Sequence, residues 1–385
     1  MPTESREFDI VLLGATGFTG GLIADYLAAH STTAVTVALA GRNPSKLDAV
    51  RARTGADLAV VTVDATAGRA LRDLTSRCRV LITTVGPYLV HGEEVVAACA
   101  DTGTDYLDLT GEPEFADLTY LLHNARAEAT GARLLHACGF DSVPHDLGAQ
   151  FTVDQLPEGV PLTVRGYVRM QGTFSGGTAA SALEIMARRR EARTTHDIRR
   201  QVESEPEGRT VTVATGRVGH DASTGWWVIP LPTIDPLVVA QSARQLPRYG
   251  PHFTYSHFLA ADGPLVTAAT LGGIGALAAA AQIPAARRAL ARLRPSGSGP
   301  TPAQRDKAWF TVRFVGEGGG AAVVTEVAGG DPGYTETSAM ISEAALCLAV
   351  DDLPVTAGQV TTASALGPAL RTRLQAAGIS FTVLD

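Results

Sequence analysis

Three glycines near the start of the chain have the spacing of a nucleotide-binding turn. Gly14, Gly17 and Gly20 follow the apolar run 8–13, and apolar residues recur at helical spacing after them. A strand, a glycine turn and a helix in this order let the backbone approach a pyrophosphate and point the first N–H groups of the helix at it. We therefore predict a dinucleotide site, whose pyrophosphate end is formed by Gly14, Thr16, Gly17, Phe18, Thr19 and Gly20. The alternative is a glycine-rich turn that serves packing alone.

The end of the second expected strand, 34–40, indicates which dinucleotide binds. NAD enzymes usually place an acid here for the ribose 2′-hydroxyl, whereas NADP enzymes place a cation near the 2′-phosphate. The strand ends without an acid, and four residues after it offer cations and hydrogen-bonding groups, namely Arg42, Asn43, Ser45 and Lys46. We therefore predict NADP(H), with a solvated basic loop as the alternative. Asp64, after the third expected strand, is expected near the adenine or as a cap of that strand.

A turn after the fourth expected strand, 80–85, would meet the other half of the dinucleotide. In a doubly wound sheet this turn lies at the carboxyl ends of the strands, beside the point where the strand order reverses. We predict that the nicotinamide half contacts its backbone, which is formed by Thr84, Val85, Gly86, Pro87 and Tyr88.

Polar side chains after the fifth and sixth expected strands could contact a substrate. We expect Asp108, Glu112 and Asp141 to bind it, and His145, in the first turn of a helix, to act as an acid or base. Helix capping is the alternative for Asp141. A second glycine turn could hold an anion or a carbonyl, or could simply join a strand to a helix; it comprises Ser175, Gly176, Gly177 and Thr178.

The elements that would hold these residues alternate between strand and helix over the first part of the chain. This alternation predicts a parallel sheet covered on both faces, with strands at 8–13, 34–40, 58–63, 80–85, 106–109 and 133–137. Beyond about residue 155 the strand-like stretches have few crossover helices between them. We predict the α/β class, with an N-terminal Rossmann doubly wound parallel sheet and a second α+β domain built on a mainly antiparallel sheet.

The length of 385 residues fits two domains. We expect an NADP-binding Rossmann domain at 1–150, an α+β domain for substrate binding and dimerisation at 151–330, and a C-terminal segment at 331–385 that packs back on the Rossmann domain.

Composition narrows the functional class. A net charge of −7 argues against a nucleic-acid partner, because phosphate neutralisation needs a dominant basic face. The four cysteines form no CxxC pair and no histidine has metal-ligand spacing, so we expect no metal site and no disulfide framework. The N-terminus lacks the basic start and long apolar middle of a signal peptide, which indicates a cytoplasmic protein.

Residues 263–286 form a stretch of 24 residues without a charge. Its many Ala and Gly residues favour a buried or dimer-interface helix over a membrane span. Arginines alternate with apolar residues after it, so the alternative is peripheral membrane contact through 264–294 at the inner face of the cell membrane.

Several segments together resemble the saccharopine dehydrogenase-like oxidoreductases, namely 14–20, 40–43, 85–88, 106–112 and 139–148. Residues 174–178, 329–334 and the ending after 351–354 are similar to the actinobacterial branch that includes trans-acting enoyl reductases of polyketide-derived lipids. The resemblance covers nearly the whole chain. It implies a pyridine nucleotide in the Rossmann domain and a second domain for substrate contacts and dimerisation.

The resemblance also implies an activity, the reduction of the enoyl double bond of a polyketide or fatty-acyl thioester by NADPH. This reaction needs a donor for the enolate oxygen and a proton for the α-carbon. Tyr88, Tyr106 and His145 are the candidates, with a packing role as the alternative for both tyrosines. An acyl carrier protein or polyketide synthase would carry the substrate. An amino-acid or imine oxidoreductase of the saccharopine type, and a non-catalytic NADP(H)-binding or lipid-associated protein, are the other candidates.

Overall fold

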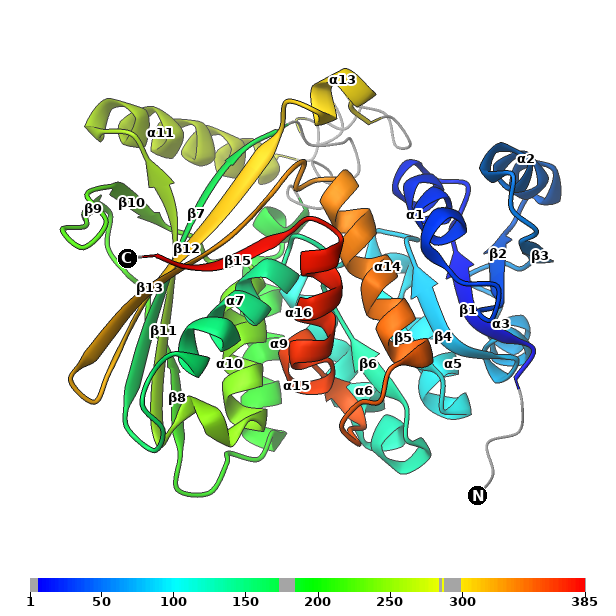
Figure 1. The fold of residues 1–385 in the computed structure, drawn as a ribbon, viewed down its shortest axis with the longest axis horizontal. Coiled ribbons are helices and arrows are strands. Elements are labelled where there is room, and N and C mark those ends of the chain that lie inside the picture. Colours follow the sequence, from blue (N-terminus) through cyan, green and yellow to red (C-terminus); the bar gives the residue numbers. More distant parts are fainter. Residues whose placement is uncertain (1–5, 173–183, 284–285, 287–298, 385) are drawn as a thin grey trace. The chain divides into compact units, whose positions relative to one another are not determined.

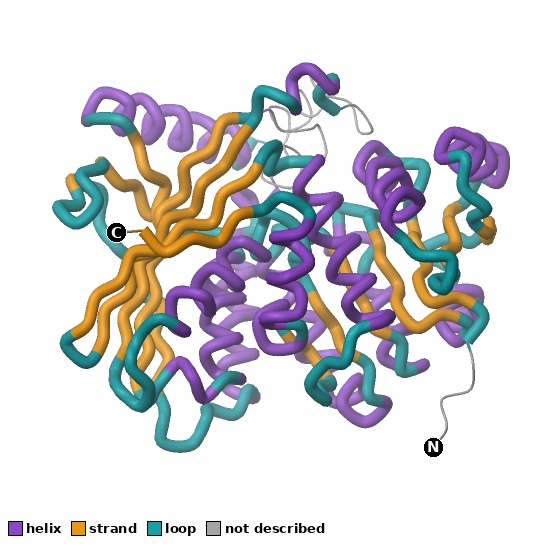
Figure 2. Tube along the Cα trace, viewed as in Figure 1, coloured by secondary structure: helices purple, strands orange, loops and turns teal. Residues whose placement is uncertain are grey.

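The computed structural model of the chain describes residues 6–172, 184–283, 286 and 299–384 (Figure 1). The chain divides into two compact units. Unit 1 comprises residues 1–139 and 334–377, and unit 2 comprises 140–333 and 378–385. Each unit contains one sheet with helices packed on it (Figure 2).

The sheet of unit 1 is entirely parallel, as predicted. Its strand order is β14-β6-β5-β4-β1-β2-β3, so the order reverses between β1 and β4. The strands are β1 Phe8–Leu13, β2 Val37–Gly41, β3 Ala59–Thr62, β4 Cys78–Thr83, β5 Asp105–Asp108, β6 Arg133–Leu135 and β14 Gly358–Val360. The Rossmann prediction is confirmed, with β14 added at the far edge by the C-terminal part of the chain.

Helices cover both faces of this sheet. Val11 and Leu13 pack with α3, α5 and α6, whereas Ile10 and Leu12 are equally buried on the opposite face, because successive side chains of a strand alternate. On that second face α14 packs against β1, β4 and β5 and against α1. The helices of unit 1 are α1 Phe18–His30, α2 Pro44–Thr54, α3 Gly68–Ser76, α4 Tyr88–His91, α5 Glu93–Thr102, α6 Pro113–Thr130, α14 Thr335–Val350, α15 Thr362–Ala365 and α16 Gly367–Ala376.

The sheet of unit 2 is mixed. Its order is β15-β13-β12-β7-β11-β10-β9, and β8 also pairs with β11. β11 runs parallel to β7 and β8, and the remaining neighbours are antiparallel. The strands are β7 Leu162–Gln171, β8 Thr210–Val213, β9 Gly219–His220, β10 Trp227–Pro230, β11 His252–Ala261, β12 Trp309–Gly318, β13 Ala321–Gly329 and β15 Ser380–Leu384.

Two helices of unit 2, α7 and α10, pack on the sheet and on each other (Figure 1). A Cβ atom at Gly148 of α7 would lie 2.3 Å from the ring of Phe314, so only glycine permits this close approach of helix to sheet. The helices of unit 2 are α7 Val143–Asp154, α9 Arg189–Val202, α10 Asp235–Gln245, the 3-10 helix η1 Pro247–Tyr249, α11 Pro264–Ala281 and α13 Pro302–Arg305.

The unit boundaries differ from the expected ones. The boundary drawn at residue 150 would fall inside α7, and because α7 packs on β7, β12 and β13 the units separate at 139/140 instead. The expected C-terminal segment 331–385 also divides, since 334–377 belongs to unit 1 while β15 extends the sheet of unit 2 beside β13.

Helix α11 forms most of the uncharged stretch 263–286. It is the one helix of the described residues that is long and apolar enough to cross a membrane, with a mean hydropathy of 1.6, and only 11% of it is buried. Its large side chains face outward, among them Leu265 at 84% exposure. The expectation of a helix buried within the chain is therefore corrected, because neither β10 nor β11, on which it packs, covers this face.

Candidate functional site

The glycine turn of unit 1 is packed so tightly that two of its glycines have no room for a side chain. Gly14 has φ +95°, and a Cβ atom there would lie 2.6 Å from Oγ1 of Thr84. A Cβ atom at Gly20 would lie 2.2 Å from the carbonyl oxygen of Gly14. The N–H of Gly17 donates to that same carbonyl at 3.0 Å and closes the turn. These contacts let α1 begin directly against the end of β1.

The start of α1 is open to a ligand. Gly17 is the N-cap, no side chain among the described residues caps the helix, and its first turn carries no acid. The leading N–H groups of a helix have no partner within it and favour an anion. Thr16 and Gly17 are exposed, and the ring of Phe18 packs edge-on against Tyr334 at 5.1 Å. Thr84 joins the same turn, donating from Oγ1 to the carbonyl of Gly14 at 3.2 Å.

A group of exposed polar side chains follows β2. Asn43 caps α2, because its Oδ1 accepts the N–H of Lys46 at 3.0 Å, so this residue serves the helix as well as the loop. Arg42, Ser45 and Lys46 are exposed, and neither cation forms an ion pair with any residue that the structure describes. A guanidinium, an ammonium and a hydroxyl are therefore available to one external anion.

Asp64 forms a local turn after β3. Its Oδ1 accepts the N–H and the hydroxyl of Thr66, each at 2.9 Å. These hydrogen bonds, led by the backbone N–H, hold the pKa of Asp64 below its usual value, and the positive charge of Arg42 adds a smaller contribution. The capping role considered for Asp64 is the one that its contacts fit.

The turn from Thr84 to Tyr88, expected beside the nicotinamide, is held by Glu112. The carboxylate of Glu112 accepts the N–H of Tyr88 at 3.1 Å and the N–H of Leu89 at 3.0 Å. The hydroxyl of Tyr88 donates to the carbonyl of Thr83 and accepts the N–H of Leu109, both at 3.2 Å. Glu112, expected as a substrate ligand, therefore positions this turn, whose Gly86–Pro87 peptide is cis.

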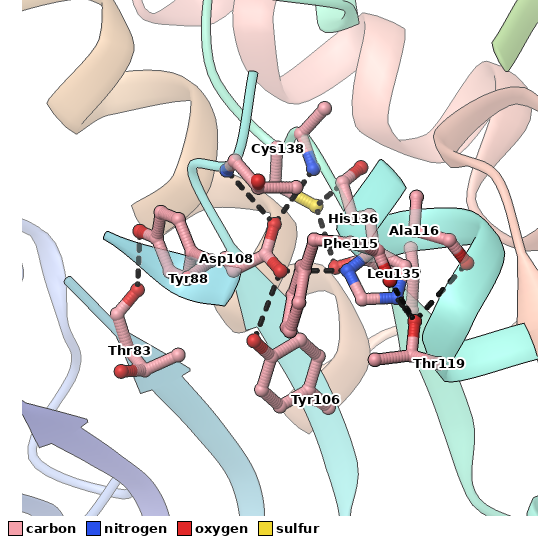
Figure 3. A network of polar contacts seen from close by, with 12 residues as sticks. Thr83, Tyr88, Tyr106, Asp108, Phe115, Ala116, Thr119, Leu135, His136 and Cys138 are labelled. Atoms are coloured by element: carbon pink, nitrogen blue, oxygen red, sulfur yellow. Dashed lines mark hydrogen bonds and ion pairs between the residues drawn. The ribbon is translucent and has the colours of Figure 1, made fainter. Parts of the chain in front are cut away.

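A buried polar network lies at the carboxyl ends of β5 and β6 (Figure 3). Oδ2 of Asp108 accepts the hydroxyl of Tyr106 at 2.9 Å and Nδ1–H of His136 at 2.6 Å. Oδ1 of Asp108 accepts the N–H of Thr110 at 3.0 Å and that of Ala137 at 2.8 Å. The other ring nitrogen of His136 lies 3.0 Å from Oγ1 of Thr119.

This network corrects two expectations. Tyr106, a candidate donor for the enolate oxygen, is fully buried near the start of β5, and its hydroxyl donates to Asp108. Burial, reinforced by the charge of Asp108, raises the pKa of Tyr106 far above its usual value. Asp108 is equally buried and already accepts four hydrogen bonds, so neither residue presents an atom to a substrate. His136, which sequence reasoning missed, completes the network from the end of β6, and its one signal was its place after an apolar strand.

The remaining expected residues lie elsewhere. Asp141 is exposed in the turn before α7. His145 is buried in the first turn of α7, with Nδ1 3.0 Å from Oδ1 of Asp235. The second glycine turn, Ser175 to Thr178, lies outside the described residues. The structure thus brings the glycine turn, Thr84 and the Tyr88 turn together in unit 1, and places His145 in unit 2.

Comparison with known proteins agrees with this reading of unit 1. The family described as the saccharopine dehydrogenase NADP binding domain matches residues 10–133. That range contains the glycine turn, Arg42 and Glu112. They lie in three loops that follow β1, β2 and β5, at the carboxyl ends of the parallel strands.

Full-length relatives extend the match to both units. A protein of Mycobacterium tuberculosis, provisionally named a trans-acting enoyl reductase, is 37% identical, over 99% of this chain and 98% of its own. The trans-acting enoyl reductase of Mycobacterium ulcerans is 34% identical, over 98% of each chain. Saccharopine dehydrogenase (L-Glu forming) of Saccharomyces cerevisiae has a similar fold, with a TM-score of 0.57 at 14% identity over 98% of this chain and 100% of its own. The chain therefore belongs to the saccharopine dehydrogenase-like oxidoreductases, in the branch that includes the mycobacterial trans-acting enoyl reductases.

Proposed function

We propose that this protein is an NADPH-dependent enoyl reductase that acts on a polyketide or fatty-acyl thioester in lipid biosynthesis. The observation that carries the cofactor choice is the exposed pair Arg42 and Lys46 after β2, where the chain has no acid. The full-length similarity to proteins named trans-acting enoyl reductases supports the reaction.

The proposal gives each part of the unit 1 site a task. The turn at Gly14 to Gly20 and the open start of α1 bind the pyrophosphate, and Arg42, Ser45 and Lys46 bind the 2′-phosphate. Bound NADPH would supply a hydride to the β-carbon of the unsaturated thioester, while a proton goes to the α-carbon.

The same proposal makes Glu112 and the Asp108 network positioning groups. Glu112 holds the backbone at Tyr88 and Leu89, against which the nicotinamide would lie. Asp108 accepts hydrogen bonds from the chain after β5 and from the chain after β6. These bonds hold the carboxyl ends of the two strands in a fixed position relative to each other. A rigid surface of this kind places the nicotinamide in one orientation toward the substrate.

The test measures NADPH absorbance after addition of 2-enoyl thioesters on coenzyme A or on an acyl carrier protein. Consumption of NADPH with formation of the saturated thioester is expected, and the saturated thioester itself serves as the control. If NADPH binds and an amino-acid-derived imine oxidises it instead, the saccharopine-type alternative replaces the proposal. Binding without oxidation by either substrate class would identify a non-catalytic NADP(H)-binding protein.

We also propose a carrier for the substrate, since the relatives are named trans-acting. An acyl carrier protein or the carrier domain of a polyketide synthase would present the thioester to the enzyme. A much higher kcat/KM for the carrier-bound thioester than for the coenzyme A thioester is expected. Equal values for the two would contradict this part of the proposal.

A second proposal concerns α11, which we infer contacts the inner face of the cell membrane from the cytoplasmic side. Its Leu265, Val266 and Leu271 are exposed on a helix without a charged residue, and exposed apolar patches mark sites of membrane or protein contact. In the sequence Arg287 and Arg288 follow shortly after, as in segments attracted to anionic lipid.

Co-flotation with anionic vesicles tests this contact. Binding to phosphatidylglycerol vesicles should exceed binding to phosphatidylcholine vesicles, and Leu265→Glu should weaken it. Val355→Glu, at another fully exposed apolar position, is the control. If the protein binds neither kind of vesicle, and gel filtration shows a dimer that Leu265→Glu dissociates, α11 is a homodimer interface instead.

A further inference from the structure

Three side chains that are far apart in the sequence meet in the interior of unit 2. His145 comes from the first turn of α7, Asp235 is the first residue of α10, and His257 lies within β11. All three are buried, with side-chain exposures of 3%, 6% and 1%. One potential ligand atom from each lies within 4.8 Å of the other two.

The ligand atoms lie close together, but not all of them have a hydrogen-bond partner. Nδ1 of His145 lies 3.0 Å from Oδ1 of Asp235, and Nε2 of His257 lies 3.9 Å from Oδ2. The second ring nitrogen of His145 and Nε2 of His257 form no hydrogen bond among the described residues, and the contact between Nδ1 of His145 and Oδ1 of Asp235 is short but poorly aligned for one. Buried polar atoms without partners destabilise the folded chain unless a ligand satisfies them. One carboxylate and two imidazoles that approach this closely have the separations of ligands around a single ion.

The contacts of His257 orient its ring so that Nε2 can serve as a ligand. Nδ1 of His257 lies 3.0 Å from the hydroxyl of Tyr255, which leaves Nε2 directed at Asp235. A histidine held through one ring nitrogen and offering the other is the usual arrangement around a bound metal. The ring of His145 also packs edge-on against that of His257, with centroids 4.9 Å apart.

The buried negative charge of Asp235 also favours a bound cation. A buried carboxylate needs a positive partner, and among the described residues the ion pairs of Asp235 are with the imidazoles of His145 and His257 and not with an arginine or lysine. A divalent cation bound by the two imidazoles in their neutral form would balance the charge of Asp235.

We propose that His145, Asp235 and His257 bind a divalent transition-metal ion, with Zn²⁺ the best match to two imidazoles and one carboxylate. The ion joins α7, α10 and β11, so its role is structural, within unit 2. The proposal does not depend on the enoyl reductase activity. The sequence contains no short metal-binding motif here, because His145 and Asp235 are 90 positions apart and Asp235 and His257 are 22 positions apart.

The test begins with the metal content of the untagged wild-type protein. We expect about one Zn²⁺ per chain by elemental analysis after gel filtration. His257→Ala and Asp235→Asn should lose it, whereas His252→Ala, at an exposed histidine of the same strand, should keep it. Equal metal content in all four proteins would place the ion elsewhere and overturn the assignment.

Wild-type protein alone gives a second measurement, which is independent of how well the variants fold. Protein stripped by a chelator should bind Co²⁺ with a visible d–d spectrum that saturates at about one equivalent, and Zn²⁺ should displace it and raise Tm. A wild-type protein that contains no metal and shows neither the Co²⁺ spectrum nor the rise in Tm would overturn the proposal. The three residues would then share a proton rather than a metal.

Discussion

The carboxylate of Glu112 accepts the backbone N–H of Tyr88 at 3.1 Å and so fastens the turn after β4 to the end of β5. Its second oxygen accepts the N–H of Leu89, and the side chain is almost fully buried. Removal of the carboxylate takes away this partner from both N–H groups.

Glu112→Ala should therefore destabilise the protein and weaken NADPH binding together. Loss of the partner of the buried N–H of Tyr88 costs about 1–3 kcal/mol, and the part-buried N–H of Leu89 adds less. Urea unfolding measures the stability, and NADPH titration measures the affinity. Glu94→Ala, at an exposed position of α5, should change neither, and a Glu112→Ala protein of wild-type stability and affinity would disprove the positioning role.

Tyr106→Phe separates packing from catalysis. Tyr106 donates one hydrogen bond to Asp108 and is fully buried, so its loss should cost about 1 kcal/mol of unfolding free energy. Turnover of the enoyl thioester should stay within about twofold of wild type, since the network keeps three of its four donors to Asp108. A fall of a hundredfold or more in kcat would restore Tyr106 as a catalytic residue.

The glycine turn allows a matched pair of substitutions. Gly20→Ala places a Cβ atom 2.2 Å from the carbonyl of Gly14 and must push α1 away from the turn, so both Tm and NADPH affinity should fall. Gly17→Ala places it 3.4 Å from the same oxygen, where the turn can accommodate it, so Tm should stay close to wild type. Equal losses of Tm in the two variants would contradict the observed packing of α1.

Arg42→Ala tests the choice of cofactor. If Arg42 contacts the 2′-phosphate, NADPH affinity should fall roughly ten- to hundredfold while NADH affinity changes little. Arg51→Ala, which removes an exposed arginine already paired with Asp48 in α2, is the control and should leave both affinities unchanged. A similar loss for NADPH and NADH would show that Arg42 does not recognise the phosphate.

Acid stability should depend on the contact between Asp351 and Arg373. The guanidinium of Arg373 donates to both oxygens of Asp351, at 2.6 and 2.7 Å, and holds the pKa of that carboxyl below its usual 3.8. A lowered folded-state pKa means that the stabilisation is complete above pH 3.8 and is lost as the pH falls from there through the folded-state value.

The stability difference between wild type and Asp351→Asn should therefore shrink as the pH is lowered below 3.8, and should be constant above about pH 5. Urea unfolding at a series of pH values measures it. The neighbouring exposed Asp352, changed to Asn, should keep the wild-type profile. An Asp351→Asn difference that does not change with pH would exclude this contact as the cause.

The sequence by itself determined six of the seven strands of the Rossmann sheet and the position of its glycine turn. Both are encoded locally: alternating apolar runs specify strands and helices, and Gly14 and Gly20 stand where no Cβ atom fits. The missing acid after β2 is a local signal of the same kind. These features need no knowledge of which distant residues become neighbours.

Only the tertiary structure decided what the polar side chains do. Tyr106 and Glu112 read in the sequence as candidates for a substrate, but long-range packing buries both and supplies each with a partner. His136 reaches Asp108 from the next strand, and Asp235 reaches His145 from another helix. Side-chain roles of this kind depend on which elements pack together, and chain spacing carries no record of that packing.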